Sequence, residues 1–185
     1  MELLLLIAIV LGVLAYVHYN KIVSAYNRVQ RAWSDVLAYQ RQKIKVLDVL
    51  EPQVAGFQDY ESQLLEKIVG LRSAITSLPS VADGEALKSV DRETKALLGG
   101  LNLAFEAYPE LKSAELMNNL MREVAEQEGN VSGAITLFNL NVEHFNNSIQ
   151  LFPGSLVNRL TLKKSLVTPF SDSQASAGFE YKPNF

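Results

Sequence analysis

Few side chains in this sequence of 185 residues have types and spacing suited to acid–base or metal chemistry. The densest carboxylates in any predicted helix are Glu123, Glu126 and Glu128. Glu143 next to His144 is the candidate acid–base pair, but adjacent helical residues point about 100° apart. Carboxylates on the surface of a helical bundle are usually solvated. We therefore predict surface or packing roles for these residues, and no catalytic, cofactor or metal site.

The composition excludes several further classes of site. Cysteine is absent and the histidines are two, His18 and His144, which excludes disulfides, thiolate zinc sites and a multi-histidine metal site within one subunit. The net charge of −3 gives no sign of nucleic-acid binding. No glycine-rich phosphate loop and no G-x-S-x-G motif is found. We expect a protein that is not an enzyme and does not bind nucleic acid.

A set of asparagines lies in or beside predicted apolar helix stripes: Asn27, Asn139, Asn141, Asn146 and Asn147. Asparagine is unfavourable there unless its amide finds hydrogen-bond partners. One interpretation is that these residues fix helix register, as a buried asparagine does in a coiled coil. The other is that they form polar binding sites in a groove between helices. The sequence leaves both interpretations open.

The element that positions everything else is the apolar stretch Leu3–Tyr19, which predicts a single membrane-spanning helix. It carries no charge up to Val17, and a helix over Met1–Tyr19 reaches roughly 28 Å, close to the hydrocarbon thickness. A core helix of a soluble protein usually has a polar stripe, and a cleaved signal has a basic start and a small-x-small cleavage site. We expect a retained anchor with membrane-spanning residues at Leu3, Leu6, Ile9, Gly12 and Val17.

Basic residues follow this span and none precedes it: Lys21, Arg28, Arg31, Arg41, Lys43 and Lys45. The positive-inside rule then places the N-terminus outside and the body in the cytoplasm. An extracytoplasmic body is the alternative. The lipid bilayer is the first expected partner.

Proline positions and apolar spacing predict an all-α fold, an antiparallel bundle of three to four long helices. The span continues into one rod over Tyr19–Ser77, on the order of 85 Å long and kinked at Pro52. After a loop in which Asp83 is an N-cap, a helix from Leu87 ends at Pro109. The Gly99–Gly100 pair inside that helix predicts a close approach of another helix.

The last long helix, from about Ser113 to Phe152, has apolar residues at alternating steps of four and three, as in a coiled coil. Gly129 and Gly133 form a small-xxx-small step that lets another backbone come near. Pro153 ends the helix. We expect helix packing or oligomer contacts at Tyr26, Trp33, Gly129, Gly133, Phe138 and Phe145.

The chain divides into an anchor over 1–20, a bundle over 21–153, a short amphipathic helix over 154–168 and a flexible tail over 169–185. The short helix packs on the body in one interpretation, and rests on an anionic membrane surface or a neighbouring subunit in the others. Its predicted contact residues, with one from the tail, are Leu156, Leu160, Lys163, Lys164 and Phe185. The tail aromatics are expected to dock: Phe170, Phe179, Tyr181 and Phe185.

These features together resemble the LemA family of bacterial membrane-anchored helical bundles, from the anchor to about Leu160. The matching segments are Tyr26-Asn27 with Ala32-Trp33, Arg72-Ser73-Ala74, Glu106-Ala107-Tyr108-Pro109-Glu110-Leu111-Lys112, Phe145-Asn146 and Phe152-Pro153 with Leu156-Val157. The resemblance implies one span in the bacterial cytoplasmic membrane and a cytoplasmic bundle. It implies no reaction, and it points to an accessory role beside membrane proteases or other small membrane proteins.

Two functions fit the sequence. The first is a non-enzymatic, membrane-anchored scaffold that self-assembles into an oligomer, a closed ring rather than an open filament, and organises or shapes the bilayer. The second is a monomeric adaptor that tethers a membrane protease or another envelope partner through a groove between helices.

Overall fold

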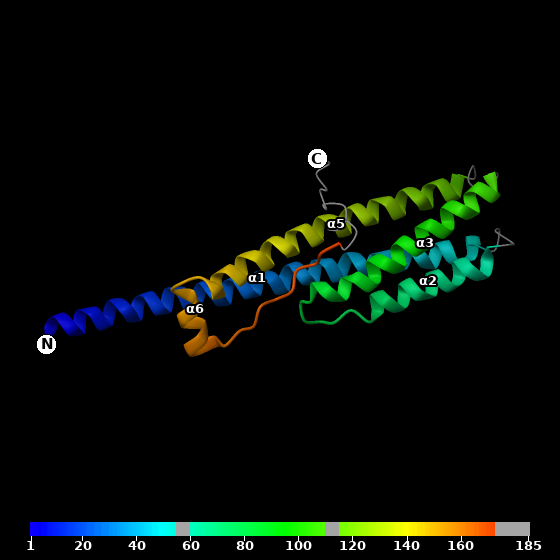
Figure 1. Ribbon diagram of the computed structural model, residues 1–185. Helices are drawn as coiled ribbons and strands as arrows, with labels where there is room; N and C mark the ends of the chain where they lie inside the picture. Colours follow the sequence, from blue (N-terminus) through cyan, green and yellow to red (C-terminus); the bar gives the residue numbers. More distant parts are fainter. Residues whose placement is uncertain (55–59, 110–114, 173–185) are drawn as a thin grey trace, which may run out of the picture.

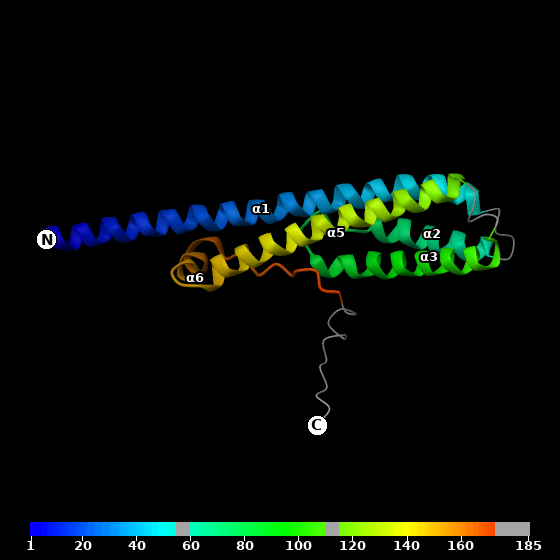
Figure 2. The ribbon, with the colours of Figure 1, turned by 90° about the horizontal axis from the view of Figure 1, so that it is seen from above.

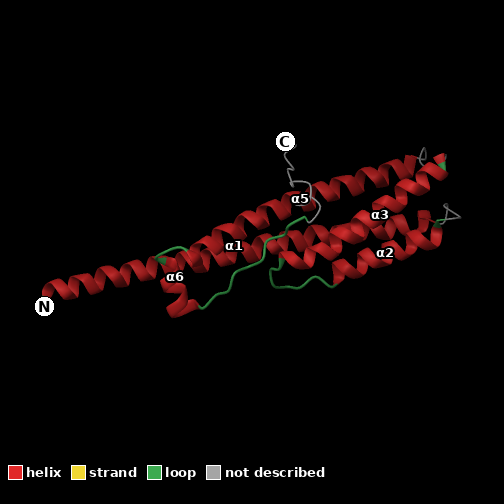
Figure 3. Cartoon of the chain, viewed as in Figure 1, coloured by secondary structure: helices red, strands yellow, loops and turns green. Residues whose placement is uncertain are grey.

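The computed structural model describes residues 1–54, 60–109 and 115–172, apart from the side chain of Leu116. The described part is all-α and contains no strand (Figure 3). The long helices are α1 (Glu2–Val54), α2 (Glu61–Thr76), α3 (Leu87–Ala107) and α5 (Glu115–Gln150). Shorter elements are the 3₁₀-helix η1 (Gly84–Ala86), α6 (Gly154–Val157) and the π-helix η2 (Asn158–Leu162).

Helix α1 begins as a bare apolar rod and ends inside the bundle (Figure 1). Its N-terminal part has a mean hydropathy of 2.1 over a window that is 0% buried inside the chain. By length and composition this part is able to cross a membrane, a test that signal sequences also pass. The apolar side chains up to Val17 are exposed because no other described helix reaches them. From Ile22 onward α1 buries one stripe.

The prediction of one kinked rod over Tyr19–Ser77 is wrong. Pro52 lies in the last turn of α1, and α2 runs back along α1 as an antiparallel hairpin (Figure 2). The apolar stripe of α2 needs a partner surface, and folding back buries it against α1 and α3: Leu64, Ile68, Leu71 and Ile75. Arg72 also reaches back to Asp48 and Glu51 of α1, at 2.8 Å from each. The residues that make the turn lie outside the described part.

The far half of the molecule is a bundle of α1, α2, α3 and α5, and the half nearer the N-terminus is mainly α1 beside α5 (Figure 2). Each half has its own core. The far core contains Leu50, Ile68 and Leu101, and the near core contains Trp33, Phe138 and Phe145. The predicted heptad stripe of α5 is therefore largely correct, because its buried side faces α1 along the whole contact.

The loop between α2 and α3 agrees with its prediction at Asp83, whose side chain accepts a hydrogen bond from the Glu85 amide and caps η1. The glycine pair of α3 agrees in part. A Cβ at Gly100 would lie 3.1 Å from Leu64 Cδ2 of α2, so helix approach is close there. Gly99 faces open space.

The segment after α5 differs from the prediction of a short helix over 154–168 and a tail from 169. Helical structure ends at Leu162, and Lys163 takes a left-handed conformation with φ of 50°. Residues 163–172, which we call the C-terminal strap, then run extended across the bundle toward the start of α3 (Figure 1). Phe179, Tyr181 and Phe185 lie outside the described residues.

Candidate functional site

Three asparagine side chains hold the C-terminal strap by the same pattern. Asn139 Nδ2 donates to the Phe170 carbonyl at 2.8 Å, and the Phe170 amide donates to Asn139 Oδ1 at 2.9 Å. Asn146 forms the same pair of bonds with Val167, at 2.9 and 3.0 Å. An asparagine amide offers a donor and an acceptor side by side, so it can pair with both backbone groups of one extended residue. The strap is therefore bound as a peptide, through its backbone.

The spacing of the two clamps on α5 matches that of their partners. Asn139 and Asn146 are seven residues apart, about 10.5 Å along a helix. Val167 and Phe170 are three residues apart, about 10 Å in extended chain. Asn158 makes a third clamp with Lys164, at 2.9 Å for both bonds. The register interpretation of these asparagines is thus wrong for Asn139 and Asn146, which bind a segment of chain rather than aligning two helices.

The strap also fastens the α2–α3 hairpin. The Gly84 amide donates to the Thr168 carbonyl at 3.0 Å, and a Cβ at Gly84 would collide with the backbone of Pro169 and Phe170. Lys95 of α3 lies 2.8 Å from Asp91 and 3.3 Å from Asp172 of the strap. The hydrogen bond that Lys95 donates to the Asp91 carboxylate, with those that it donates to Asp172, raises the pKa of Lys95 above its ordinary value.

Beneath the strap lies a buried charge, Lys43, which in the sequence counts only as one of the basic residues that follow the span. Lys43 is 3% exposed, its Nζ is 2.6 Å from Glu128 Oε1 and it donates to Thr94 Oγ1 at 3.3 Å. Gln40, also 3% exposed, has an Oε1 with no hydrogen-bond partner among the described residues. A cavity of about 220 Å³ opens beside these side chains and is lined on its outer side by Phe170 and Asp172.

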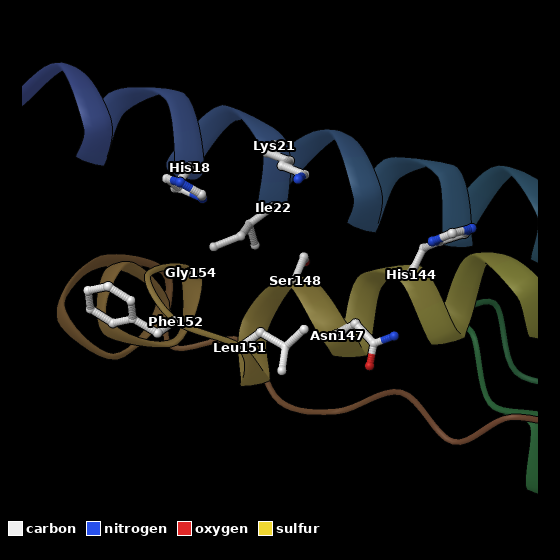
Figure 4. Close-up of a pocket in the computed structure, with 9 residues that line it drawn as sticks. All are labelled: His18, Lys21, Ile22, His144, Asn147, Ser148, Leu151, Phe152 and Gly154. Carbon is white, nitrogen blue, oxygen red and sulfur yellow. The ribbon is translucent and has the colours of Figure 1, made fainter.

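A second cavity, which we call the junction pocket, lies where the apolar part of α1 meets the bundle. Its volume is about 270 Å³. It is lined by His18, Lys21, Ile22, His144, Asn147, Ser148, Leu151, Phe152 and Gly154. Figure 4 shows His144 reaching from α5 toward α1, while His18 and Ile22 point toward the turn after α5. The lining thus combines two imidazoles and one ammonium, with no carboxylate.

Beside the junction pocket the turn after α5 exposes large apolar side chains. Phe152 is 82% exposed, Leu160 70%, Leu151 64% and Leu156 50%. We call these four residues the apolar foot. The foot lies at the level where α1 enters the bundle (Figure 1). Arg159 and Lys163 are exposed in the same segment.

Four of the predicted packing residues are brought together in the near core. Trp33 and Phe138 have ring centroids 5.2 Å apart, and Tyr26 and Phe145 have theirs 5.3 Å apart. Trp33 Nε1 also donates to the Pro79 carbonyl at 2.9 Å, which holds the α2–α3 loop against α1. These aromatic pairs join α1 to α5 within one chain.

Lys163 and Lys164, both predicted to contact a membrane or a subunit, lie in different surroundings. Lys164 Nζ sits 3.9 Å from the centre of the Tyr26 ring, so its charge is used inside the chain. Lys163 remains exposed beside it. Phe185 lies outside the described residues.

Gly129 and Gly133 are exposed on α5, and a Cβ at either would meet nothing within 4 Å. They share one face with Thr136, Leu137 and Leu140, which we call the open face of α5. Leu137 and Leu140 are each 49% exposed. The whole stretch Gly129–Val142 carries no charged residue, although a fifth of the chain is charged. A long uncharged and exposed helix face is suited to packing against another helix.

The predicted carboxylate cluster is dispersed. Glu128 pairs with Lys43, and Glu123 accepts from Gln127 at 3.1 Å. His144 lines the junction pocket whereas Glu143 lines a separate surface hollow. No group of three histidines or acids placed to hold a metal ion occurs in the described ranges.

The fold and these features define a class: a long helical bundle whose first helix projects beyond it as an apolar rod able to cross a membrane. A family model described as the LemA family matches residues 32–176. The chain belongs to the LemA family. The matched stretch includes α5, all three asparagine clamps and the strap, and it begins after the apolar rod.

A curated relative agrees with this membership. Protein LemA of Metamycoplasma hominis is 26% identical over 133 residues, which is 72% of this chain. The chain spans about 60% of the length of that relative.

Proposed function

We propose that this LemA-family protein is a non-enzymatic scaffold, held by one span in the bacterial cytoplasmic membrane, that self-assembles through the open face of α5. The observation that carries the proposal is that face itself. This face of α5 has two glycines and exposed leucines. It carries no charged residue between Gly129 and Val142. Small residues let a second helix approach closely, and the leucines supply apolar area to bury.

The anchor and the apolar foot support the membrane part of the proposal. The rod of α1 stays exposed up to the level of the foot, and an exposed apolar helix is stable in lipid but not in water. Basic residues concentrate after the rod, so the body lies on the cytoplasmic side. The bundle then projects from the membrane, and each subunit of the assembly is held at the same height above the surface.

Chemical cross-linking of the full-length protein in its membrane tests this function. Wild type is expected to give a ladder of self-products. Gly133→Arg places a charge on the open face without disturbing the fold, because the site is exposed and unfilled. It is expected to abolish the ladder. Gly99→Arg on α3 is the matched control, since Gly99 also faces open space, and it should leave the ladder unchanged.

Two results would contradict the proposal. A ladder that survives Gly133→Arg would remove the open face of α5 as the interface. A single product with a different protein, and no self-product, would favour a monomeric adaptor that tethers a membrane protease or other envelope partner.

A further inference from the structure

We propose that the junction pocket binds the phosphate group of an anionic lipid. The inference rests on the membrane insertion of the apolar rod, and not on self-assembly. It extends the proposed function by assigning a lipid class and a headgroup site.

The first argument is position. Apolar side chains of α1 are exposed up to Tyr19, and His18 and Lys21 lie on either side of the end of that stretch. A span that ends there brings the junction pocket to the depth of the lipid headgroups. Phosphate is the charged group found at that depth in every phospholipid leaflet.

The second argument is chemistry. Lys21 offers an ammonium, His18 and His144 offer ring N–H groups, and Asn147 offers an amide. Lys21 forms no ion pair with any carboxylate of the described residues. The remaining polar residue, Ser148, donates its hydroxyl to the Phe145 carbonyl at 2.7 Å. The pocket therefore presents hydrogen-bond donors and positive charge from two helices. These groups fit an anion with several acceptor oxygens.

The third argument concerns the rim. Leu151 and Phe152 line the pocket and also belong to the apolar foot, at 64% and 82% exposed. A free inorganic anion would gain nothing from such a rim. A lipid places acyl chains against it while its phosphate enters the pocket, so polar and apolar parts are both satisfied. The cavity of about 270 Å³ has room for a phosphodiester headgroup.

The test is native mass spectrometry of the detergent-purified full chain with equal amounts of phosphatidylglycerol and phosphatidylcholine. Wild type is expected to retain phosphatidylglycerol at least about tenfold over phosphatidylcholine. The double variant Lys21→Gln with His144→Gln should lose that preference. Both side chains are exposed, so the fold should be kept, which the thermal midpoint checks. Lys45→Gln, an equal charge change on α1 far from the pocket, should keep the preference.

Further arms separate the possible failures. If inorganic phosphate at millimolar concentration displaces the lipid, and soluble glycerol phosphate displaces it equally well, the pocket is a site for soluble anions. The assignment of a lipid ligand is then overturned. If the preference for phosphatidylglycerol persists in the double variant, the junction pocket is not the lipid-binding site. Flotation with phosphatidylcholine vesicles reports insertion separately. A chain that fails to float contradicts membrane insertion of the apolar rod, on which this inference rests. A chain that floats but shows no lipid preference contradicts only the assignment of the junction pocket as the lipid site.

Discussion

At the scale of single residues, the asparagines of α5 show why a side chain with both a donor and an acceptor can fix a loop. The backbone N–H and C=O groups of an extended chain are usually paired with a neighbouring strand. Here the side chains of Asn139 and Asn146 make these bonds instead. The bonds are half-buried, which makes their loss costly because the freed backbone groups of the strap are then incompletely hydrated. The strap should therefore depend on individual amides.

Replacing Asn146 with alanine is expected to release Val167 and to lower the free energy of unfolding by about 1–2 kcal/mol, since two hydrogen bonds are lost. Limited trypsin digestion measures the release directly, as faster cleavage after Lys164. Asn141→Ala is the control, because among the described residues the Asn141 side chain bonds only to the Leu137 carbonyl of its own helix. Equal cleavage of the two variants would show that the clamp does not hold the strap.

The Lys43–Glu128 pair makes a different prediction at the same scale. Glu128→Gln leaves the ammonium of Lys43 buried with Thr94 as its remaining partner. The free energy of unfolding, measured by denaturant titration, should fall by about 3 kcal/mol. Adding Lys43→Met to that variant should recover part of the loss, because the unpaired charge is removed. A double variant no more stable than the single one would argue against this explanation.

At the scale of elements, the strap joins parts of the bundle that are separate in the chain. Figure 2 shows α5 beside α1 and α3 beside α2, with the strap running alongside α5 and the start of α3. Its bonds to Asn139 on one side and to Gly84 on the other link the two pairs. The strap thus connects the two helix pairs at the end of the bundle nearer the N-terminus.

Gly84→Val is expected to lift the strap from the α2–α3 hairpin, since even a Cβ collides with the Pro169 and Phe170 backbone. Hydrogen exchange should be faster at the amide of position 84 and at the amide of Phe170, with α3 still protected. Gly99→Val, at a position with open space, is the control for the general cost of valine in a helix. Unchanged exchange at the Phe170 amide would contradict the role given to Gly84.

Apolar periodicity was sufficient to predict α5 and the buried stripe of α1, because both patterns are local and repeat over many turns. The α1–α2 reversal was missed because Pro52 is compatible with a kink or an end, and the choice is made by tertiary burial of α2. The clamps were missed for a similar reason. Asn139 and Phe170 are 31 residues apart, and nothing near Asn139 in the chain indicates a partner. The Lys43–Glu128 pair is equally long-range.

At the scale of the whole molecule, the apolar foot and the junction pocket lie together where the apolar rod meets the bundle, and in the proposed function this level is the membrane surface. The bundle stands away from that surface, with its far core at the opposite end (Figure 1). In the function proposed above, this arrangement gives the molecule a fixed orientation, and subunits that meet through α5 would do so side by side in the plane of the membrane.

The orientation itself is testable because the chain contains no cysteine. Gly99→Cys adds one exposed thiol to α3 in the body. A membrane-impermeant maleimide is expected to leave it unlabelled in intact cells and to label it after lysis, as the positive-inside rule requires. Labelling in intact cells would place the body on the extracytoplasmic side.

The most direct test of the central claim is the mass of the detergent-purified full-length protein, compared with a chain that lacks Met1–Asn20. A scaffold that assembles through the open face of α5 predicts a discrete oligomer in both cases, because the interface lies in the bundle. Monomers in both preparations would contradict self-assembly. An oligomer that is lost with the anchor would contradict the assignment of the interface to α5.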